Sequence, residues 1–222
     1  MRIESKHQLK VSYFQSVLLG WFDLNQRVFP WRNADISNYQ IIISEVLLQR
    51  TKAETVSRFY QKFITAFPNW EDLINADLDN IEEFLRPIGL FKQRAKRLKD
   101  LAEHMVGLGG IIPDDRKKID KIPMLGQYIA NSIELQIFKR KMPLLDVNMA
   151  RVLERFFKQR KLADIRYDPF LQNLAFEIVN VDRSKDLNWA VLDFAAIICK
   201  ARNPMCTICP INSKCNYFIN IG

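Results

Sequence analysis

All four cysteines of the chain lie in one short segment. Cys199, Cys206, Cys209 and Cys215 follow the pattern C-x6-C-x2-C-x5-C, and the rest of the 222 residues contain none. Thiolates are soft ligands that bind zinc or iron–sulfur clusters. Structural zinc sites usually pair two short cysteine knuckles across a longer gap, whereas this segment contains one short pair. The spacing therefore favours an iron–sulfur cluster over zinc, with four unliganded thiols as a third interpretation.

A glutamate interrupts an aliphatic stretch of the sequence. Glu45 lies in IIISEVLL at 41–48, with aliphatic residues on both sides. Loss of solvent at such a position favours the protonated carboxyl, which makes it a usable proton donor near neutral pH. The alternative is a glutamate on the solvent-facing side of a helix. Because aliphatic residues cover most of this turn, at least one adjacent face must be polar or functional.

A second acidic residue stands at a predicted helix start. Asp146 follows the break at Pro143 and opens an apolar-periodic segment, so the pattern predicts a helix N-cap. That role does not exclude chemistry. A carboxylate kept ionised at a helix start can also stabilise positive charge that develops during a reaction, or position an attacking water.

The composition restricts the class of protein. The net charge is +8, with 33 Lys and Arg against 25 Asp and Glu, which makes a polyanionic partner a serious hypothesis. No apolar run approaches the roughly 18 residues of a membrane span, and MRIESKHQLK carries no signal-peptide pattern. We therefore expect a cytoplasmic protein in a reducing environment without a membrane partner, where a cysteine cluster is more typical of a metal or redox site than of a disulfide framework.

The elements that position these residues are predicted to be helices. Glycines are few, proline and glycine punctuate the chain where helices should end, and apolar residues recur at spacings of three and four. The predicted helical segments are 11–22, 39–67, 92–108, 126–138, 146–158, 170–181 and 188–199. The sequence therefore predicts an all-α protein.

The cysteine spacing, at the end of a basic helical chain, resembles the 4Fe-4S loop of the endonuclease III-type superfamily of helix-hairpin-helix DNA glycosylases. Other segments resemble this family in the same order along the chain. RVFPWR and ISEVLLQRT resemble the segment that leads into the substrate pocket of the mismatch glycosylases, and IGLFKQRAKRL resembles the second minor-groove loop. KIPMLGQYIANSI resembles the helix-hairpin-helix, and LLDVNMARVLERFF carries the family's aspartate.

The resemblance implies a fold and a division of the chain. Its fold is all-α and two-lobed. Residues 31–141 are expected to form a six-helix barrel domain that carries the helix-hairpin-helix. Residues 1–30 and 142–222 are expected to form a discontinuous helical domain that ends in the 4Fe-4S cluster loop at 199–215. The active cleft of the family lies between the two lobes.

The resemblance also implies an activity. Asp146 takes the place of the family's catalytic aspartate, and Glu45 that of a glutamate that protonates the leaving purine in adenine glycosylases. Tyr128 occupies the position of a lysine that forms a Schiff base in bifunctional enzymes, which a phenol cannot do. This implies a monofunctional glycosylase that leaves an abasic site. Tyrosine there is most similar to the thymine-DNA mismatch glycosylases, which remove T or U opposite G, although ordinary helix packing also explains Tyr128.

Several further residues match DNA-binding positions of the family. Gln49 and Leu90 match residues that wedge into the base stack, although a solvated glutamine and a core leucine are alternatives. Gly126 precedes a helix whose backbone N–H groups can bind a phosphate, and the turn carbonyls can hold a monovalent cation. The hairpin departs from the family at Met124, where a glycine is usual, which puts its geometry in doubt. Basic residues near these loops and near the cysteines are expected to contact phosphates, namely Arg50, Lys92, Arg94, Lys96, Arg97, Lys99, Lys200, Arg202 and Lys214. A solvated helix face is the alternative for the run from Lys92 to Lys99.

The expected partner is double-stranded DNA with a mismatched or damaged base, bound by a monomer. Two alternatives remain. An adenine glycosylase acting opposite G or 8-oxoguanine is supported by Glu45 and the RVFPWR segment, but the sequence stops shortly after the cysteines, without the C-terminal domain that such enzymes usually carry. A catalytically silent DNA-damage binding module should lack an aspartate such as Asp146. The sequence does not identify the base that is removed.

Overall fold

The computed structural model describes residues 5–220, and within this range the chain forms helices and no strand. This confirms the predicted all-α fold. The chain divides into two compact units. Unit 2 comprises Val28–Ile133, and unit 1 combines the residues up to Arg27 with those from Glu134 onward. The sequence had placed the domain limits at 31 and 141.

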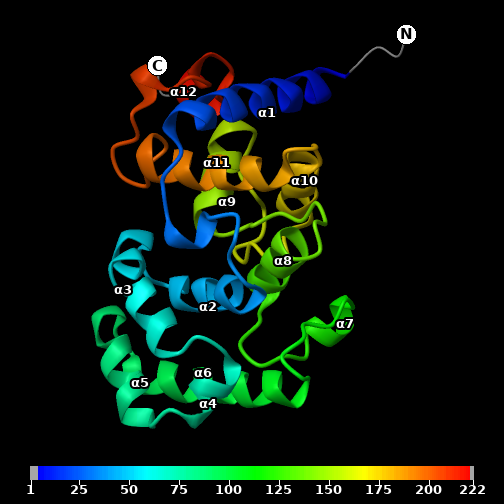
Figure 1. Cartoon of the computed structure of the whole chain (residues 1–222). Helices are drawn as coiled ribbons and strands as arrows, with labels where there is room; N and C mark the ends of the chain where they lie inside the picture. Colours follow the sequence, from blue (N-terminus) through cyan, green and yellow to red (C-terminus); the bar gives the residue numbers. More distant parts are fainter. Residues whose placement is uncertain (1–4, 221–222) are drawn as a thin grey trace. The chain divides into compact units, whose positions relative to one another are not determined.

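Unit 1 is built from the two ends of the chain. Its helices are α1 (Lys6–Asn25), α9 (Val147–Phe156), α10 (Pro169–Val179), α11 (Ser184–Ile197) and α12 (Asn216–Ile219) (Figure 1). Helix α1 packs along α11, while α9 packs against α10 and α11. Their buried faces form one apolar core, in which Phe14 and Phe156 lie with ring centroids 5.0 Å apart. This core fixes α9, the helix that begins after Asp146.

Unit 2 is a succession of shorter helices around α6. It contains η1 (Pro30–Arg32), α2 (Asn38–Leu48), α3 (Ala53–Ala66), α4 (Trp70–Asn75), α5 (Leu78–Leu85), η2 (Arg86–Ile88), α6 (Phe91–Gly107), α7 (Arg116–Ile119) and the first part of α8 (Gln127–Gln136). Helices α4 and α5 pack on α6, and α2 packs on α3. Helix α8 runs across the boundary between the two units.

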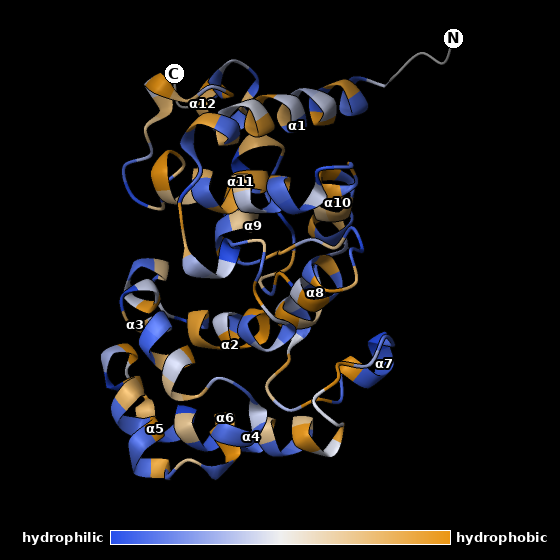
Figure 2. Ribbon diagram, in the orientation of Figure 1, coloured by the Kyte–Doolittle hydropathy of each residue, from blue (hydrophilic) through white to orange (hydrophobic). Residues whose placement is uncertain are grey.

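Hydropathy explains why the long helices pack as they do. Figure 2 shows hydrophilic and hydrophobic residues on the same helices, as expected when one stripe of a helix is buried. Local sequence also sets several helix starts. Ser5 and Gln8 form a capping box before α1, and Ser37 and Gln40 form another before α2. No helix within residues 5–220 is long and apolar enough to cross a membrane.

One predicted helix was wrong. The periodic segment 39–67 is divided into α2 and α3 by a turn in which Arg50 has a left-handed φ of 56°. Apolar periodicity continued across this turn because both helices pack in one unit. The guanidinium of Arg94 stabilises the break by donating to the carbonyl of Gln49 at 2.8 Å and to the hydroxyl of Thr51 at 3.2 Å. Apolar periodicity does not indicate this contact, because Arg94 is far from the turn in the sequence.

Candidate active site and cysteine cavity

Asp146 caps helix α9, as the sequence predicted. Its Oδ1 accepts hydrogen bonds from the backbone N–H groups of Asn148 at 2.9 Å and Met149 at 2.8 Å, and its Oδ2 accepts one from the Asn148 side-chain amide at 2.6 Å. The carboxylate is thus held in one orientation by three donors from the first turn of its own helix. A group fixed in this way needs no reorganisation when charge develops beside it.

Two effects compete on the ionisation of Asp146. Burial of the carboxyl raises the pKa of Asp146, while the hydrogen bonds from Met149 and Asn148 and the charge of Arg151 lower it, and burial has the larger effect. The residue as a whole is only partly buried. The carboxylate is therefore poorly solvated but well hydrogen-bonded, which strengthens its interaction with any cationic centre nearby.

A chain of side chains connects Asp146 to the cysteine segment. Arg151 donates from one guanidinium nitrogen to the Asn148 side-chain carbonyl at 3.1 Å, and from the others to the backbone carbonyls of Cys199 at 3.0 Å and Ala195 at 3.0 Å. Asn148 in turn donates to Asp146. Helix α9 therefore carries the capping aspartate at its start and, one turn later, an arginine that holds the end of α11.

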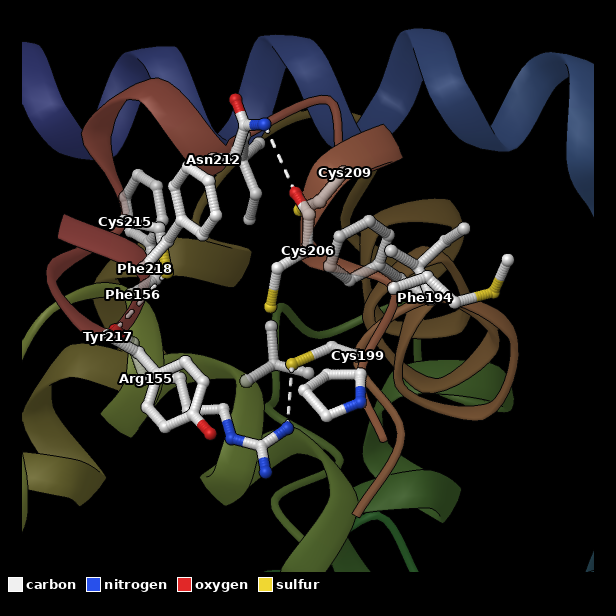
Figure 3. Close-up of a pocket in the computed structure, with 15 residues that line it drawn as sticks. Arg155, Phe156, Phe194, Cys199, Cys206, Cys209, Asn212, Cys215, Tyr217 and Phe218 are labelled. Atoms are coloured by element: carbon white, nitrogen blue, oxygen red, sulfur yellow. Dashed lines mark hydrogen bonds between the residues drawn. The ribbon is translucent and has the colours of Figure 1, made fainter. Parts of the chain in front are cut away.

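The four cysteines line one cavity, which opens to solvent. Figure 3 shows the sulfurs of Cys199 and Cys206 projecting into this space, with Cys209 and Cys215 on its other sides. Two 3-10 helices, η3 (Cys206–Ile208) and η4 (Asn212–Lys214), shape the segment between α11 and α12. Their turns account for the uneven cysteine spacing, because each one returns the chain toward the cavity.

Arg155 binds this segment on its polar side. Its guanidinium donates to the carbonyls of Lys200 at 2.7 Å and Ala201 at 3.1 Å, and lies 3.5 Å from the sulfur of Cys199 (Figure 3). It also stacks 4.8 Å from the ring centroid of Tyr217. The loop that carries Lys200 and Arg202 is therefore anchored to α9, while both of these basic residues are exposed.

The four cysteine side chains are the candidate ligands for a group bound in this cavity. Within residues 5–220, no three His, Cys, Asp or Glu side chains are arranged to hold a metal ion. The four thiols instead lie around a shared volume. Burial raises the pKa of Cys209 to about 11 and also raises the pKa of Cys206. The four cysteines can therefore share one bound group.

Glu45 is buried in unit 2, as its aliphatic surroundings indicated. It lies in α2 with 6% of its surface exposed, and its Oε1 accepts a 2.6 Å hydrogen bond from the hydroxyl of Ser132 on α8, which is fully buried. The alternative of a solvent-facing glutamate is thus wrong. Tyr128 is half-buried and lies one turn before Ser132, on the same side of α8. Unit 2 therefore brings Glu45, Ser132 and the turn of Tyr128 together.

The predicted wedge residues lie on turns. Gln49 is exposed at the end of α2, and Leu90 is 63% exposed with a left-handed φ of 50° before α6. The alternative of Leu90 as a core leucine is therefore wrong. An exposed leucine in this backbone conformation is unusual, and such conformations gather at functional sites. The side-chain amide of Gln49 also lies 3.4 Å from the carbonyl of Met124, so the turn after α2 contacts the hairpin.

Met124 explains the departure of the hairpin from the family pattern. Its φ of 67° lies in the left-handed region, where glycine is usual, so the side chain is tolerated at a cost in backbone strain. The exposed Gly126 follows, and its N–H donates to the carbonyl of Met124 at 3.0 Å. The turn therefore keeps the conformation that the usual glycine would give. A monovalent cation at this turn stays a prediction.

Positive charge concentrates beside these turns. Burial lowers the pKa of the Arg94 guanidinium, and the charges of Arg50 and Arg97 lower it further. Three arginines this close repel one another, so an anion among them would be stabilised. A phosphate is the anion that a basic turn with exposed backbone most readily accepts.

Some residues of these sites carried no signal in the sequence analysis. Ser132, Asn148, Arg151 and Arg155 were not predicted. Asn148 and Arg151 are three residues apart on one helix, so their contact with each other follows from helical spacing, but the spacing does not link either to Asp146. Ser132 could have been proposed only as the residue one turn after Tyr128. Arg155 contacts the loop more than forty residues later, which spacing does not indicate.

Known proteins similar to this chain are DNA glycosylases. The chain is 37% identical over 208 residues to the thymine-DNA glycosylase of Aeropyrum pernix, covering 91% of this chain and 93% of that protein. It is 34% identical over 211 residues to the thymine/uracil-DNA glycosylase of Methanothermobacter thermautotrophicus, covering 94% and 95%. Its structure is similar to that of a thermostable thymine-DNA glycosylase, with a TM-score of 0.90, 32% identity and coverage of 97% and 100%.

Family membership follows from the sequence match. Residues 43–166 match the HhH-GPD superfamily of base excision DNA repair proteins. This range is more than half of the chain and includes the helix-hairpin-helix, Glu45, Tyr128 and Asp146. The chain therefore belongs to the HhH-GPD superfamily, and the family that the sequence indicated is confirmed.

Proposed function

We propose that this protein is a monofunctional DNA glycosylase that removes T or U opposite G and leaves an abasic site. The observation that carries the proposal is Asp146, a poorly solvated carboxylate fixed by three donors at the start of α9. The thymine-DNA and thymine/uracil-DNA glycosylases to which the chain is similar over more than nine-tenths of its length support this choice of base.

The chemistry divides between two carboxyl groups. As the bond from C1′ to the base breaks, its electron pair leaves with the base and positive charge develops on the sugar. Asp146, in its ionised form, stabilises that charge and orients the water that adds to C1′. Glu45, in its protonated form, gives its proton to the departing base. Tyr128 has no amine, so no Schiff base forms and the strand stays intact.

DNA must be held while the base is turned out of the stack. The turns that carry Gln49 and Leu90 are exposed, and both side chains can occupy the space that the base vacates. Arg50, Lys200, Arg202 and the backbone at Gly126 are placed on exposed turns where phosphates can reach them. We propose that one chain supplies both the excision residues and the residues that fill the vacated space, so that the protein acts as a monomer.

We also propose that Cys199, Cys206, Cys209 and Cys215 hold a 4Fe-4S cluster. The four thiols that line one cavity and their uneven spacing support this proposal. Bound there, the cluster would cross-link the segment between α11 and α12 and stabilise the loop that presents Lys200 and Arg202. The cleavage chemistry assigned to the carboxyl groups does not pass through it.

The cofactor can be tested on protein purified without oxygen. Iron and acid-labile sulfide should each be found at about four per chain, with the visible absorbance of an iron–sulfur cluster. Cys206→Ala should lose both. One zinc per chain and no sulfide would contradict the cluster and favour the alternative metal.

The activity can be tested by single-turnover cleavage of labelled duplexes that contain G:T, G:U or A opposite 8-oxoguanine. Each product is developed with and without alkali, because an abasic site breaks only after alkali treatment. We expect alkali-dependent breakage at T or U. Breakage at adenine would assign the chain to the adenine glycosylases. Breakage without alkali would contradict a monofunctional enzyme, and binding without breakage would indicate a damage-binding module.

A further inference from the structure

The hydrogen bond between Ser132 and Glu45 joins two buried groups from distant parts of unit 2. Ser132 is 0% exposed, and its hydroxyl lies 2.6 Å from Oε1 of Glu45, across 87 residues of sequence. A buried hydrogen bond to a carboxyl group is worth more than an exposed one, because neither partner can be replaced by water without cost. The contact is therefore strong enough to control the carboxyl group.

A serine hydroxyl has one proton to donate, and a protonated carboxyl has one oxygen that carries a proton and one that does not. When Ser132 donates to Oε1, the acidic proton of Glu45 is directed to Oε2. When that proton leaves, the same hydrogen bond joins a hydroxyl to a carboxylate, and charge-assisted bonds are roughly twice as strong as neutral ones. The bond therefore strengthens while the proton is transferred, which is the condition for accelerating the step.

We propose that Ser132 is a positioning residue that selects Oε2 of Glu45 as the proton-donating oxygen and stabilises the carboxylate formed as the base departs. The inference rests on the proposed function, in which Glu45 protonates the leaving base. The proton moves from Oε2 to the base, the electron pair of the C1′–N bond also goes to the base, and Ser132 keeps its own proton throughout.

The test is a double-mutant cycle measured as single-turnover excision on saturating DNA, with DNA affinity measured separately. Ser132→Ala should slow excision about tenfold, the difference between a neutral and a charge-assisted hydrogen bond, and leave the Kd for DNA unchanged. In the Glu45→Gln background no carboxylate forms. Adding Ser132→Ala there should change the rate by no more than roughly twofold.

A matched control separates this effect from the loss of any buried hydroxyl. Ser44 is 1% exposed on the same helix as Glu45, and its hydroxyl donates to the carbonyl of Ile41 at 2.7 Å. Ser44→Ala should leave the excision rate unchanged. Circular dichroism and thermal unfolding of each variant show whether it is folded at the assay temperature.

The outcomes distinguish this inference from the proposed function. An unchanged rate in Ser132→Ala, or an equal loss in the wild-type and Glu45→Gln backgrounds, would overturn the role of Ser132 while the glycosylase activity stands. Full activity of Glu45→Gln would also overturn it. A wild-type protein that excises no base from any of the three duplexes would instead overturn the proposed function.

Discussion

Glu45 and Asp146 are both carboxyl groups withdrawn from solvent, yet the structure holds them in different ways. Asp146 accepts its three hydrogen bonds from Asn148 and Met149, which follow it directly in the chain. Glu45 accepts a hydrogen bond from Ser132, which is 87 residues away. The first carboxyl group is thus oriented by its own helix, whereas the second is in contact with a different helix of the folded unit. Two groups of the same chemistry are positioned by local and by tertiary contacts.

The two carboxyl groups also depend on different parts of the fold. The surroundings of Asp146 form whenever α9 forms, because cap and helix are one local unit. The surroundings of Glu45 exist only when α2 and α8 meet in the folded unit 2. Substitutions can therefore separate a locally determined site from one that tertiary packing creates.

Asp146→Asn should have the largest effect on activity. Asparagine caps helices as well as aspartate, but its amide nitrogen cannot accept from the Asn148 side chain, so the free energy of unfolding should fall by about 1–2 kcal/mol. Excision should nevertheless fall by roughly 10³-fold, because the negative charge that stabilises the sugar is gone. Single-turnover kinetics and chemical denaturation measure the two quantities.

Asp115 offers a control for the cap itself. It accepts hydrogen bonds from the backbone of Lys117 at 2.8 Å and Lys118 at 3.3 Å at the start of α7. Asp115→Asn makes the same chemical change at a different helix start and should leave the excision rate unchanged. Full turnover by Asp146→Asn would remove Asp146 from the mechanism.

Glu45→Gln should slow excision by about 10²-fold, as for the loss of a general acid. Glutamine keeps the size of the side chain and can still accept from Ser132, so the fold and the DNA affinity should be retained. Glu83→Gln, at an exposed position of α5, is the matched control. Excision by Glu45→Gln at the wild-type rate would show that Glu45 does not protonate the base.

Arg94→Gln tests the turn between α2 and α3. Its guanidinium bonds to Gln49 and Thr51 hold that turn in place. We expect excision to fall about tenfold because the Gln49 wedge is misplaced, with a loss of about 1 kcal/mol in the free energy of unfolding. Lys62→Gln removes one exposed positive charge from α3 and should change neither quantity. Equal effects of both variants would mean that Arg94 contributes only its charge.

Met124→Gly should have the smallest effect, and it should stabilise the protein. Removing a side chain from a left-handed position at φ 67° relieves about 1 kcal/mol of strain, which should raise the Tm by roughly 2–4 °C. Lys139→Gly, at φ 57°, should gain less, because the Lys139 side chain also donates to the carbonyl of Gln136 at 2.6 Å. Only the hairpin variant should also tighten DNA binding. A loss of stability in both would show that neither backbone is strained.

The sequence anticipated much of the fold and the local surroundings of two candidate site residues. It predicted an all-α chain, the Asp146 cap and the aliphatic surroundings of Glu45, and the cysteine segment was evident from spacing alone. It missed the short helices α4 and α5 between 70 and 85, which are too short to display periodicity, and it joined α2 to α3. That error arose because Arg50 and Arg94 stabilise a break that apolar periodicity does not register.

What the sequence by itself determined are the features whose interacting groups are close in the chain. These include helix caps, the apolar stripe of each helix and the cluster of cysteines, because hydrogen bonds and periodicity over a few residues are fixed by local order. Tertiary structure alone decided the pairs that span many residues, namely Ser132 with Glu45, Arg94 with Gln49 and Arg155 with the loop at Lys200. Such pairs depend on how helices pack, and packing is set by the shape of the whole core rather than by any one segment.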